Sequence, residues 1–267
     1  MTKRVLVIAD LHCGHLVGLT PPQWHIREGS QDNLTKRQKF SVIQKEMWEL
    51  YCANLRKYKP FDLVVCNGDA IDGKGDRSGG TEQITTDREE QCDMAKVCIR
   101  RALSRGTKLV MTYGTPYHTG QEEDHEGTIA RDFGAKIGSH EWVETGGVTF
   151  DFKHKVGGSQ VPHGRSTAIN REALWSNLWA GTGYTPPSDI LIRSHVHYHI
   201  STFDPSFSPS LRMTTPALQG MGSKFGARQC SGLVHMGFLV FNCNRGQYDY
   251  DLVLFDPDKQ KVEVLRV

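Results

Sequence analysis

Hydrophobic residues fall along this chain in two patterns, short unbroken apolar runs and longer stretches with helical spacing. Four unbroken runs predict strands that are buried on both faces. These runs are residues 4–9, 62–66, 108–112 and 189–193. Apolar residues spaced three or four apart predict a helix of about twenty residues from Thr35 and another over Asp87–Ser104. This alternation of strand and helix is typical of a layered α/β domain.

The second half of the chain is richer in predicted strands. Trp142–Glu144 and Val148–Phe152 flank a Gly-Gly turn and predict a hairpin. A short helix is expected to end at Gly134, and a longer one is expected over Ser166–Trp179 with Ser166 as its N-cap. Further strands are predicted at residues 211–215, 234–241, 248–255 and 262–267. Length and pattern together predict a single α/β domain over residues 1–267.

Composition and charge narrow the class of protein. Lys and Arg number 32 against 30 Asp and Glu, so net charge gives no argument for wholesale binding to nucleic acid or membrane. No apolar run approaches the roughly 20 residues of a membrane span, and Asp10 interrupts the apolar start too early for a signal peptide. We therefore expect a soluble cytoplasmic protein without a membrane partner. The sequence does not determine its oligomeric state.

The number and spacing of the cysteines also favour a cytoplasmic protein. There are seven, an odd number, and none are spaced as Cys-x-x-Cys. Cys66, Cys98 and Cys243 fall on predicted buried strands or helix faces. A disulfide framework is therefore not expected, and the cysteines fit a reducing cytosol.

Acidic and imidazole side chains follow the apolar runs directly. Residues 4–9 lead into Asp10-Leu11-His12, and residues 62–66 lead into Gly68-Asp69-Ala70-Ile71-Asp72. Side chains two apart on an extended segment point to the same side, so Asp10 and His12 are expected to face one site. The carboxyl ends of parallel strands meet at one edge of a sheet, which would bring Asp69 into the same crevice. Alone, each motif is also typical of a strand that ends in a polar turn.

Histidines follow the later strands in the same way. The third run leads into a turn over Gly114–His118, and the second strand of the hairpin ends at His154. The fourth run ends in Ser194-His195-Val196-His197-Tyr198-His199. Alternating imidazoles on an extended segment would share one face, as metal ligands do.

Taken together, these side chains predict a metal site for two ions. The six candidate ligands are Asp10, His12, Asp69, His154, His195 and His197. Asp69 is the natural bridge, because a carboxylate has two oxygens and can hold two cations about 3.5 to 4 Å apart. A mixed set of oxygen and imidazole ligands favours manganese, iron or zinc over magnesium or calcium. Manganese is our first expectation.

In this order, the motifs resemble those of the calcineurin-like metallophosphoesterase family. That family has the blocks D-x-H, G-D-x-x-D, G-N-H-D/E, a lone H and G-H-x-H, on a sandwich of two mixed β-sheets flanked by helices. The resemblance spans nearly the whole chain. It implies that Asp10, His12 and His197 bind one ion, that His154 and His195 bind the other, and that Asp69 binds both. His163 is the second choice for the lone histidine.

Two further roles follow from the resemblance. It implies that Asp72 orients His118, which then donates a proton to the leaving oxygen. The family asparagine is missing from Gly114-Thr115-Pro116-Tyr117-His118, so the second ion is expected to bind more weakly, unless Thr115 or His118 compensates. Ser194 replaces the glycine before His195. The Gly-Thr-Pro-Tyr-His and Val-Pro-His-Gly-Arg combination is similar to bacteriophage and prophage variants.

The implied activity is hydrolysis of a phosphate ester by a hydroxide activated between two metal ions. We expect a phosphodiester substrate, a nucleotide or nucleic acid, because Asp72 is followed by Gly73-Lys74-Gly75 and not by the arginine that members acting on phosphoproteins carry. Basic residues that would line a groove for such a polyanion are Lys36, Arg37, Lys39, Lys74, Arg77 and Arg165.

Three alternatives stay open at this point. One is a phosphomonoesterase or protein phosphatase of the same fold, and another is a non-catalytic scaffold that has lost its metals. The third is an amidohydrolase-like metal hydrolase, which is disfavoured because its His-x-His would open the chain and its Asp would close it.

Overall fold

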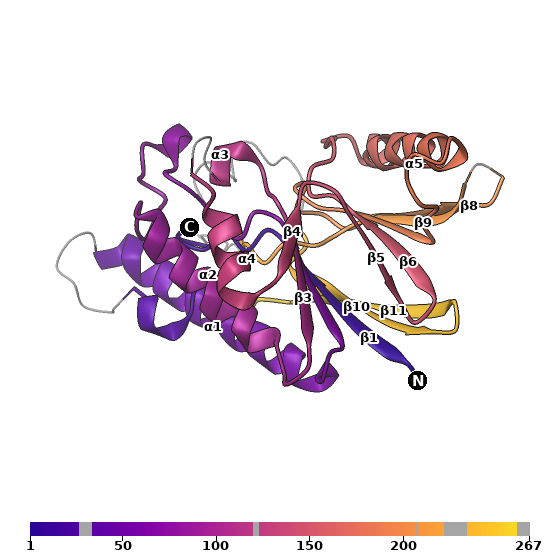
Figure 1. The fold of residues 1–267 in the computed structure, drawn as a ribbon. Coiled ribbons are helices and arrows are strands. Elements are labelled where there is room, and N and C mark those ends of the chain that lie inside the picture. Colours follow the sequence, from indigo (N-terminus) through magenta and orange to yellow (C-terminus); the bar gives the residue numbers. More distant parts are fainter. Residues whose placement is uncertain (27–33, 120–122, 207, 222–233, 261–267) are drawn as a thin grey trace.

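Two mixed β-sheets lie against each other in the computed structural model, which describes residues 1–26, 34–119, 123–206, 208–221 and 234–260 (Figure 1). The side chains of residues 34–39, 77, 119 and 259 are not among those described. Helices flank both sheets (Figure 1). The architecture predicted from the sequence, an α/β sandwich of two mixed sheets flanked by helices, is therefore confirmed.

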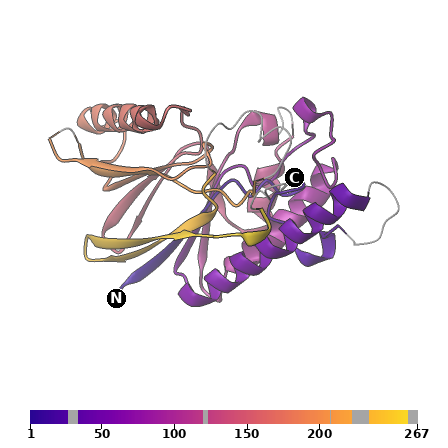
Figure 2. The same ribbon diagram turned by 180° about the vertical axis from the view of Figure 1, so that it is seen from behind.

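The first sheet has six strands, and four neighbouring ones are parallel. Their spatial order is β11 (Gln247–Leu254), β10 (Gly237–Asn244), β1 (Lys3–Ile8), β2 (Leu63–Asn67), β3 (Lys108–Thr112) and β4 (Lys136–Gly138). β10 pairs antiparallel to β1 and carries β11 beyond it, as the view from behind shows (Figure 2). The carboxyl ends of the first three chain strands therefore open at one edge.

The second sheet has five strands with three parallel ones at its centre. Their spatial order is β5 (Glu141–Thr145), β6 (Val148–Phe152), β7 (Ile190–Arg193), β9 (Ser208–Thr214) and β8 (Ser201–Asp204). β5 and β6 form the predicted hairpin. The ends of β6 and β7 point to the same side, so the residues that follow them are neighbours.

Helices cover the outer faces of the sandwich (Figures 1 and 2). They are α1 (Leu34–Tyr58), α2 (Arg88–Ala102) and α4 (His125–Phe133) on the six-stranded sheet, and α5 (Arg165–Gly181) on the five-stranded sheet. The short helix α3 (Pro116–Thr119) follows β3. Single 3-10 turns occur at η1 (Pro22–Trp24), η2 (Asp76–Ser78), η3 (Pro162–Gly164) and η4 (Asp258–Gln260).

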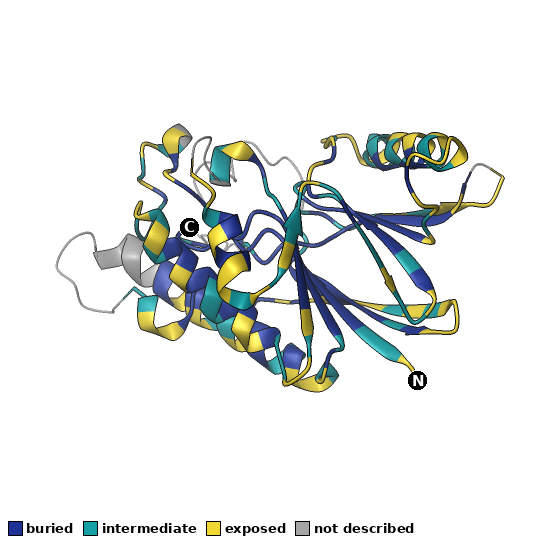
Figure 3. Cartoon of the chain, in the orientation of Figure 1, coloured by how far each residue is buried: buried dark blue, intermediate teal, exposed yellow. Residues whose placement is uncertain are grey.

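The apolar runs are continuous because each face of the six-stranded sheet is covered. On β1, Leu6 and Ile8 join the core beneath the helices, whereas Val5 and Val7 join the core between the sheets. The central strands of both sheets are buried along most of their length, whereas the edge strands are largely exposed or half-buried (Figure 3). Burial on both faces is the condition under which a strand loses its apolar–polar alternation.

The structure also corrects several predicted boundaries. Ser166 is not the N-cap of α5. The helix follows directly on the turn η3, its N-cap is Gly164, and no side chain caps its first turn. β4 and β8 were not predicted, because both are short and have no unbroken apolar run. The strand expected from residue 234 begins at Gly237. The strand expected at residues 262–267 lies outside the described residues.

Two compositional predictions can be compared with the structure. Six cysteines lie in the described part of the chain, and all six are buried and free. None of the helices that the structure describes has the length and apolar character needed to cross a membrane.

Candidate metal centre

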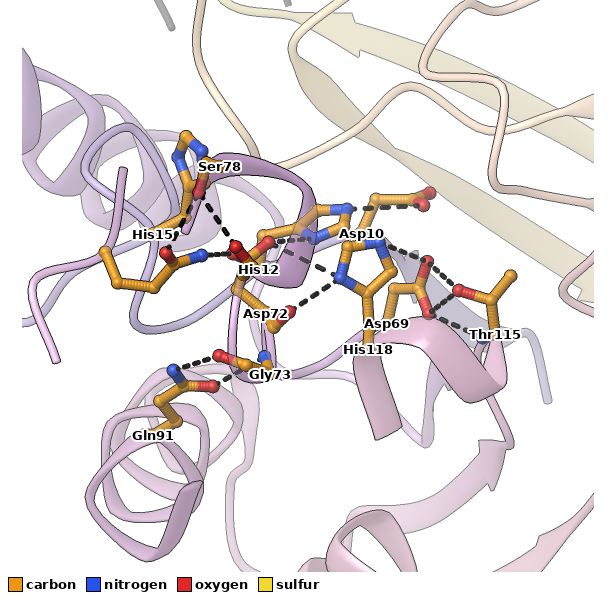
Figure 4. A network of polar contacts seen from close by, with 12 residues as sticks. Asp10, His12, His15, Asp69, Asp72, Gly73, Ser78, Gln91, Thr115 and His118 are labelled. Carbon is orange, nitrogen blue, oxygen red and sulfur yellow. Dashed lines mark hydrogen bonds and ion pairs between the residues drawn. The ribbon is translucent and has the colours of Figure 1, made fainter. Parts of the chain in front are cut away.

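The predicted acidic and imidazole side chains gather where the strand ends of the two sheets meet. Asp10 and His12 follow β1, Asp69 and Asp72 follow β2, and His118 lies on α3 after β3 (Figure 4). From the other sheet, His154 follows β6 and His195 and His197 follow β7. Most of these side chains are buried, so the cluster lies inside the protein and is not a surface patch.

An unusual backbone carries the candidate ligands. Six described residues other than glycine have a positive φ, and five of them are Asp10, His12, Asp69, His195 and His197, with φ between 45° and 73°. The extended geometry assumed for Asp-x-His and His-x-His is therefore wrong, because the strands end before these residues. Left-handed turns bring the side chains to the centre instead. Such conformations are costly outside glycine and cluster at functional sites.

One group of three possible ligands comes from both sheets. Asp10, His12 and His197 each offer an atom, and these atoms lie within 4.8 Å of one another. His197 Nε2 is 3.3 Å from Asp10 Oδ1 and 3.2 Å from His12 Nε2. The main-chain nitrogen of His195 donates to Asp10 Oδ2 at 3.2 Å, which fixes the carboxylate across the gap.

A second group lies beside the first. Asp69, His154 and His195 also offer atoms within 4.8 Å of one another. His154 Nε2 is 2.9 Å from Asp69 Oδ2, and His195 Nδ1 is 3.8 Å from the same oxygen. His154 Nε2 also lies 4.0 Å from Asp10 Oδ1, so the two groups share one cluster.

The turn after β3 closes the cluster on a third side. His118 Nε2 lies 4.0 Å from Asp69 Oδ2, and His12, Asp69 and His118 form a third possible ligand group. Thr115 stands where the resemblance led us to expect asparagine. Its main-chain nitrogen donates to Asp69 Oδ1 at 2.7 Å, and its hydroxyl lies 3.2 Å from that oxygen (Figure 4).

Asp72 contacts the Nδ1 atoms of two of these histidines. Its Oδ1 accepts from His12 Nδ1 at 2.9 Å, and its Oδ2 accepts from Gln83 (Figure 4). His118 Nδ1 is 3.5 Å from Asp72 Oδ1, but it lies 2.8 Å from the main-chain oxygen of Asp72. Asp72 thus holds His12 by its side chain and His118 mainly by its backbone.

The donor set fits divalent cations. Two buried atoms in the cluster, Asp10 Oδ1 and His154 Nε2, have no aligned hydrogen-bond partner within the described residues. Buried polar atoms are normally satisfied by hydrogen bonds, and here the nearest polar neighbours of both atoms are other candidate ligands. His12, His118 and His154 are each held through Nδ1 by a carboxylate or carbonyl oxygen, which leaves Nε2 facing the centre. This arrangement is typical of metal-binding histidines.

Burial and the neighbouring charges shift the pKa values of the cluster in different directions. Burial alone would lower the pKa of His154, but the adjacent Asp69 carboxylate raises it to about 10. Burial, together with the nearby His118, lowers the pKa of His12 to about 4, so its imidazole is neutral and able to bind metal. Burial opposes ionisation of Asp72, yet the hydrogen bond from His12 lowers its pKa to about 2.

Two glycines permit the close approach of these loops. Gly68 has φ +82°, and a Cβ there would lie 2.5 Å from the imidazole of His154. A Cβ on Gly114 would overlap Asp69 Oδ1. Any larger residue at either position would displace a candidate ligand.

Some predicted residues lie apart from the cluster. His163 is exposed on η3 and belongs to none of the ligand groups found among the described residues, so His154 is the better candidate for the lone histidine. His199 turns away and binds the main-chain oxygen of Thr214 through Nδ1 at 2.6 Å. Lys74 is exposed. The side chains of Lys36, Arg37, Lys39 and Arg77 lie outside the described residues.

Residues that support the loops were missed by the sequence patterns. Glu126 of α4 is fully buried and accepts from the main-chain nitrogens of Ala70 and Gly114, which tie the exits of β2 and β3 together. Burial, with the charge of Asp69, raises the pKa of Glu126 to about 7. Gln91 of α2 makes two hydrogen bonds of 2.8 Å to the backbone of Gly73 (Figure 4). Polar residues on the apolar faces of these helices were the available signal.

No protein-family model and no curated protein matches the sequence. Solved structures share parts of the architecture. A Vps29 mutant from Entamoeba histolytica is 16% identical, with 95% of this chain and 100% of that chain covered and a TM-score of 0.44. An archaeal phosphodiesterase is 10% identical, with 95% and 100% covered and a TM-score of 0.45. The NAD nucleotidase NadN of Haemophilus influenzae is 10% identical, with 95% and 50% covered and a TM-score of 0.43. At identities and TM-scores this low, these structures do not decide what the present chain does.

Proposed function

We propose that this chain is a calcineurin-like metallophosphoesterase, a single-domain hydrolase of phosphate esters. One observation carries the proposal: two carboxylates and four imidazoles converge from four strand ends into one largely buried cluster of possible metal ligands. Their order along the chain is that of the family motifs. A non-catalytic scaffold would have no need to keep this set in strained backbone conformations.

The proposed metal ligands fall into two sets that share Asp69. Asp10, His12 and His197 hold one ion, and His154 and His195 hold the other. Manganese is the proposed metal, with iron or zinc as alternatives, because the donors are mixed oxygen and imidazole. Bound divalent ions would lower the pKa of water towards about 7 and neutralise charge on phosphoryl oxygens.

The remaining steps belong to side chains of this protein. His118 directs Nε2 towards the ligand cluster, where it lies 4.0 Å from Asp69 Oδ2. Its Nδ1 is hydrogen-bonded to the main-chain oxygen of Asp72. In this orientation Nε2 can deliver a proton to the leaving oxygen of the ester. Thr115 and Asp72 keep Asp69 and His12 in place through the hydrogen bonds described above.

We propose a phosphodiester substrate, in a nucleotide or nucleic acid. Support comes from Arg165, whose guanidinium carbon lies 4.7 Å from the ring centre of Tyr198, the residue directly after His197. Arg165 is half-buried and its Nε has no hydrogen-bond partner among the described residues, so the guanidinium is proposed to take an anion as its partner. Exposed Lys74 adds positive charge on the loop after Asp72. A planar guanidinium suits the oxygens of a phosphate.

The deciding experiment measures metal content and hydrolysis together. Purified protein is loaded with Mn²⁺ and tested at fixed salt on bis-nitrophenyl phosphate, nitrophenyl phosphate, cyclic nucleotides, single- and double-stranded DNA and a phosphopeptide. We expect bound manganese and faster turnover of a diester than of any monoester. Protein that holds no metal and hydrolyses nothing would favour the scaffold alternative. Faster turnover of the monoester or phosphopeptide would favour the phosphatase alternative.

A further inference from the structure

A chain of buried hydrogen bonds crosses the gap between the two sheets beside the metal centre. Asn67, the last residue of β2, donates from Nδ2 to the hydroxyl of Ser194, the first residue after β7, at 2.7 Å. Thr112 donates to Asn67 Oδ1 at 2.8 Å, and Thr215 donates to the Ser194 hydroxyl at 2.9 Å. All four residues have 0% exposure. The chain links β2 and β3 of one sheet to β7 and β9 of the other.

The orientation of the Asn67 amide is determined by its surroundings. Its Nδ2 also lies 3.3 Å from the main-chain oxygen of Lys153. A carbonyl oxygen can only accept, so the amide nitrogen must lie on this side and the amide oxygen must face the Thr112 hydroxyl. Lys153 directly precedes His154. The Asn67 side chain therefore contacts both strand exits of the second sheet that carry candidate ligands.

The main chain of Asn67 acts on His154 as well. Its carbonyl oxygen accepts from His154 Nδ1 at 2.7 Å. This contact places the proton on Nδ1 and turns Nε2 towards Asp69, 2.9 Å away. Asp69 itself follows Asn67 by two residues. Through these contacts Asn67 and Ser194 touch the segments that carry Asp69, His154 and His195, which form the second ligand group.

We propose that Asn67 and Ser194 are positioning residues that set the spacing of the second ligand group across the gap between the sheets. The proposal rests on the proposed function, since it concerns a bound cation. It assigns a role to Ser194, where the motif resemblance would lead one to expect glycine. With glycine there, the Thr215 hydroxyl and the Asn67 amide would each lose a buried acceptor, and nothing else in the described residues would join them.

The test is the affinity of each metal site. Ser194→Ala and Ser194→Gly are compared with the wild-type protein by calorimetric titration of Mn²⁺ into metal-free protein and by the EPR signal of coupled Mn²⁺ pairs. We expect the weaker step to lose affinity by about 10- to 100-fold, the usual effect of removing a partner behind a metal ligand. The tighter step should change little, and the signal of coupled pairs should weaken. Thr215→Val offers the same test with a nearly isosteric side chain.

The control is Ser210→Ala. It removes a buried hydroxyl near the start of β9 that donates to the main-chain oxygen of Ser188, whereas Thr215 follows the other end of this strand. This substitution should lower the free energy of unfolding by a similar amount and leave the Mn²⁺ affinities of both binding steps unchanged. Unchanged titrations in both Ser194 variants, or an equal loss in Ser210→Ala, would overturn the proposal. Wild-type protein that binds no Mn²⁺ would instead count against the proposed function.

A double-mutant cycle of Asn67→Ala with Ser194→Ala tests whether the two residues act together. Their effects on metal affinity should be non-additive, and additive effects would contradict a shared role.

Discussion

The imidazole of His118 is held by the backbone of Asp72, whose carbonyl oxygen lies 2.8 Å from Nδ1. The Asp72 carboxylate is farther from this ring, at 3.5 Å. Replacing that carboxylate should therefore disturb His12 more than His118. The role of His118 is therefore tested by replacing His118 itself.

His118→Ala should reduce hydrolysis of an alkyl phosphodiester far more than hydrolysis of a nitrophenyl diester. Loss of a general acid costs about 100- to 10,000-fold, mostly with poor leaving groups. The measurement is kcat on the two esters at saturating Mn²⁺. His163→Ala, which removes an exposed histidine of η3, serves as the control. An equal loss on both esters would indicate a role in binding or metal ligation.

Asp69→Asn should abolish metal binding and hydrolysis while the fold persists. The carboxylate is fully buried and adjoins both ligand groups, so its loss removes several kcal/mol of charge stabilisation, on the order of 1,000-fold or more in rate. Metal analysis and circular dichroism check the two parts. Asp62→Asn, at the opposite end of β2 and paired with Lys3, should retain metal and activity. Retained metal in Asp69→Asn would remove Asp69 from the proposed ligands.

Manganese should bind in two unequal steps. The second group lacks the asparagine of the family motif, and Thr115 in that region already bonds to Asp69. Titration of metal-free protein measures both affinities. His154→Ala should eliminate the weaker step and His12→Ala the tighter one. Two equally tight steps in the wild-type protein would mean that Thr115 or His118 completes the second site.

Arg165→Gln should weaken binding of single-stranded DNA and lower its salt dependence. Removing one cation that pairs with a phosphate reduces the slope of log affinity against log salt by about 0.7 for single strands. Fluorescence anisotropy across a salt series, with the inactive Asp69→Asn protein, measures this slope. Arg165→Lys retains the charge and should keep most of the slope. Lys108→Gln, an exposed lysine at the start of β3, is the control. Identical slopes in all variants would exclude Arg165 from the substrate groove.

Asp151→Asn should destabilise the protein by about 1.5–3 kcal/mol, because it removes a buried, charge-assisted hydrogen bond and leaves only Glu172, among the described residues, to pair with the guanidinium of Arg193. Arg193, with a side chain 1% exposed, donates from Nη1 to Asp151 Oδ1 at 2.7 Å. His140 contacts the same oxygen, and Glu172 of α5 binds the other side of the guanidinium. Chemical denaturation of the two proteins measures the difference in the free energy of unfolding.

The same pair predicts a pH dependence. Burial opposes ionisation of Asp151, but Arg193 and then His140 hold its pKa well below the usual 3.8. Because the pKa of Asp151 is lower in the folded protein than in the unfolded chain, the ionised carboxylate stabilises the fold at pH values above its pKa in the unfolded chain. This contribution is lost as the pH falls below about 4. Wild-type stability should therefore decline in that acidic range more steeply than that of Asp151→Asn. Parallel curves would show that Asp151 does not control acid unfolding.

The central strands and the chemistry at their ends could be predicted from the sequence. Unbroken apolar runs such as Val5–Ile8 can only be buried on both faces, which predicts central strands of a layered domain. Parallel strands expose their carboxyl ends at one edge, so acids and histidines that directly follow them must come close. For this reason Asp10 and Asp69 could be placed near each other from the sequence.

Only the tertiary structure decided which of the remaining side chains join them and how. His154 and His163 were alternatives in sequence. The packing of the two sheets brings the end of β6 against the end of β2, which places His154 beside Asp69 while His163 stays exposed. His199 had the same spacing as its neighbours, but a bond to Thr214 turns it away. The link from Asn67 to Ser194 joins residues that are 127 positions apart. Local patterns carry no information on such contacts, because they arise only when the two sheets pack.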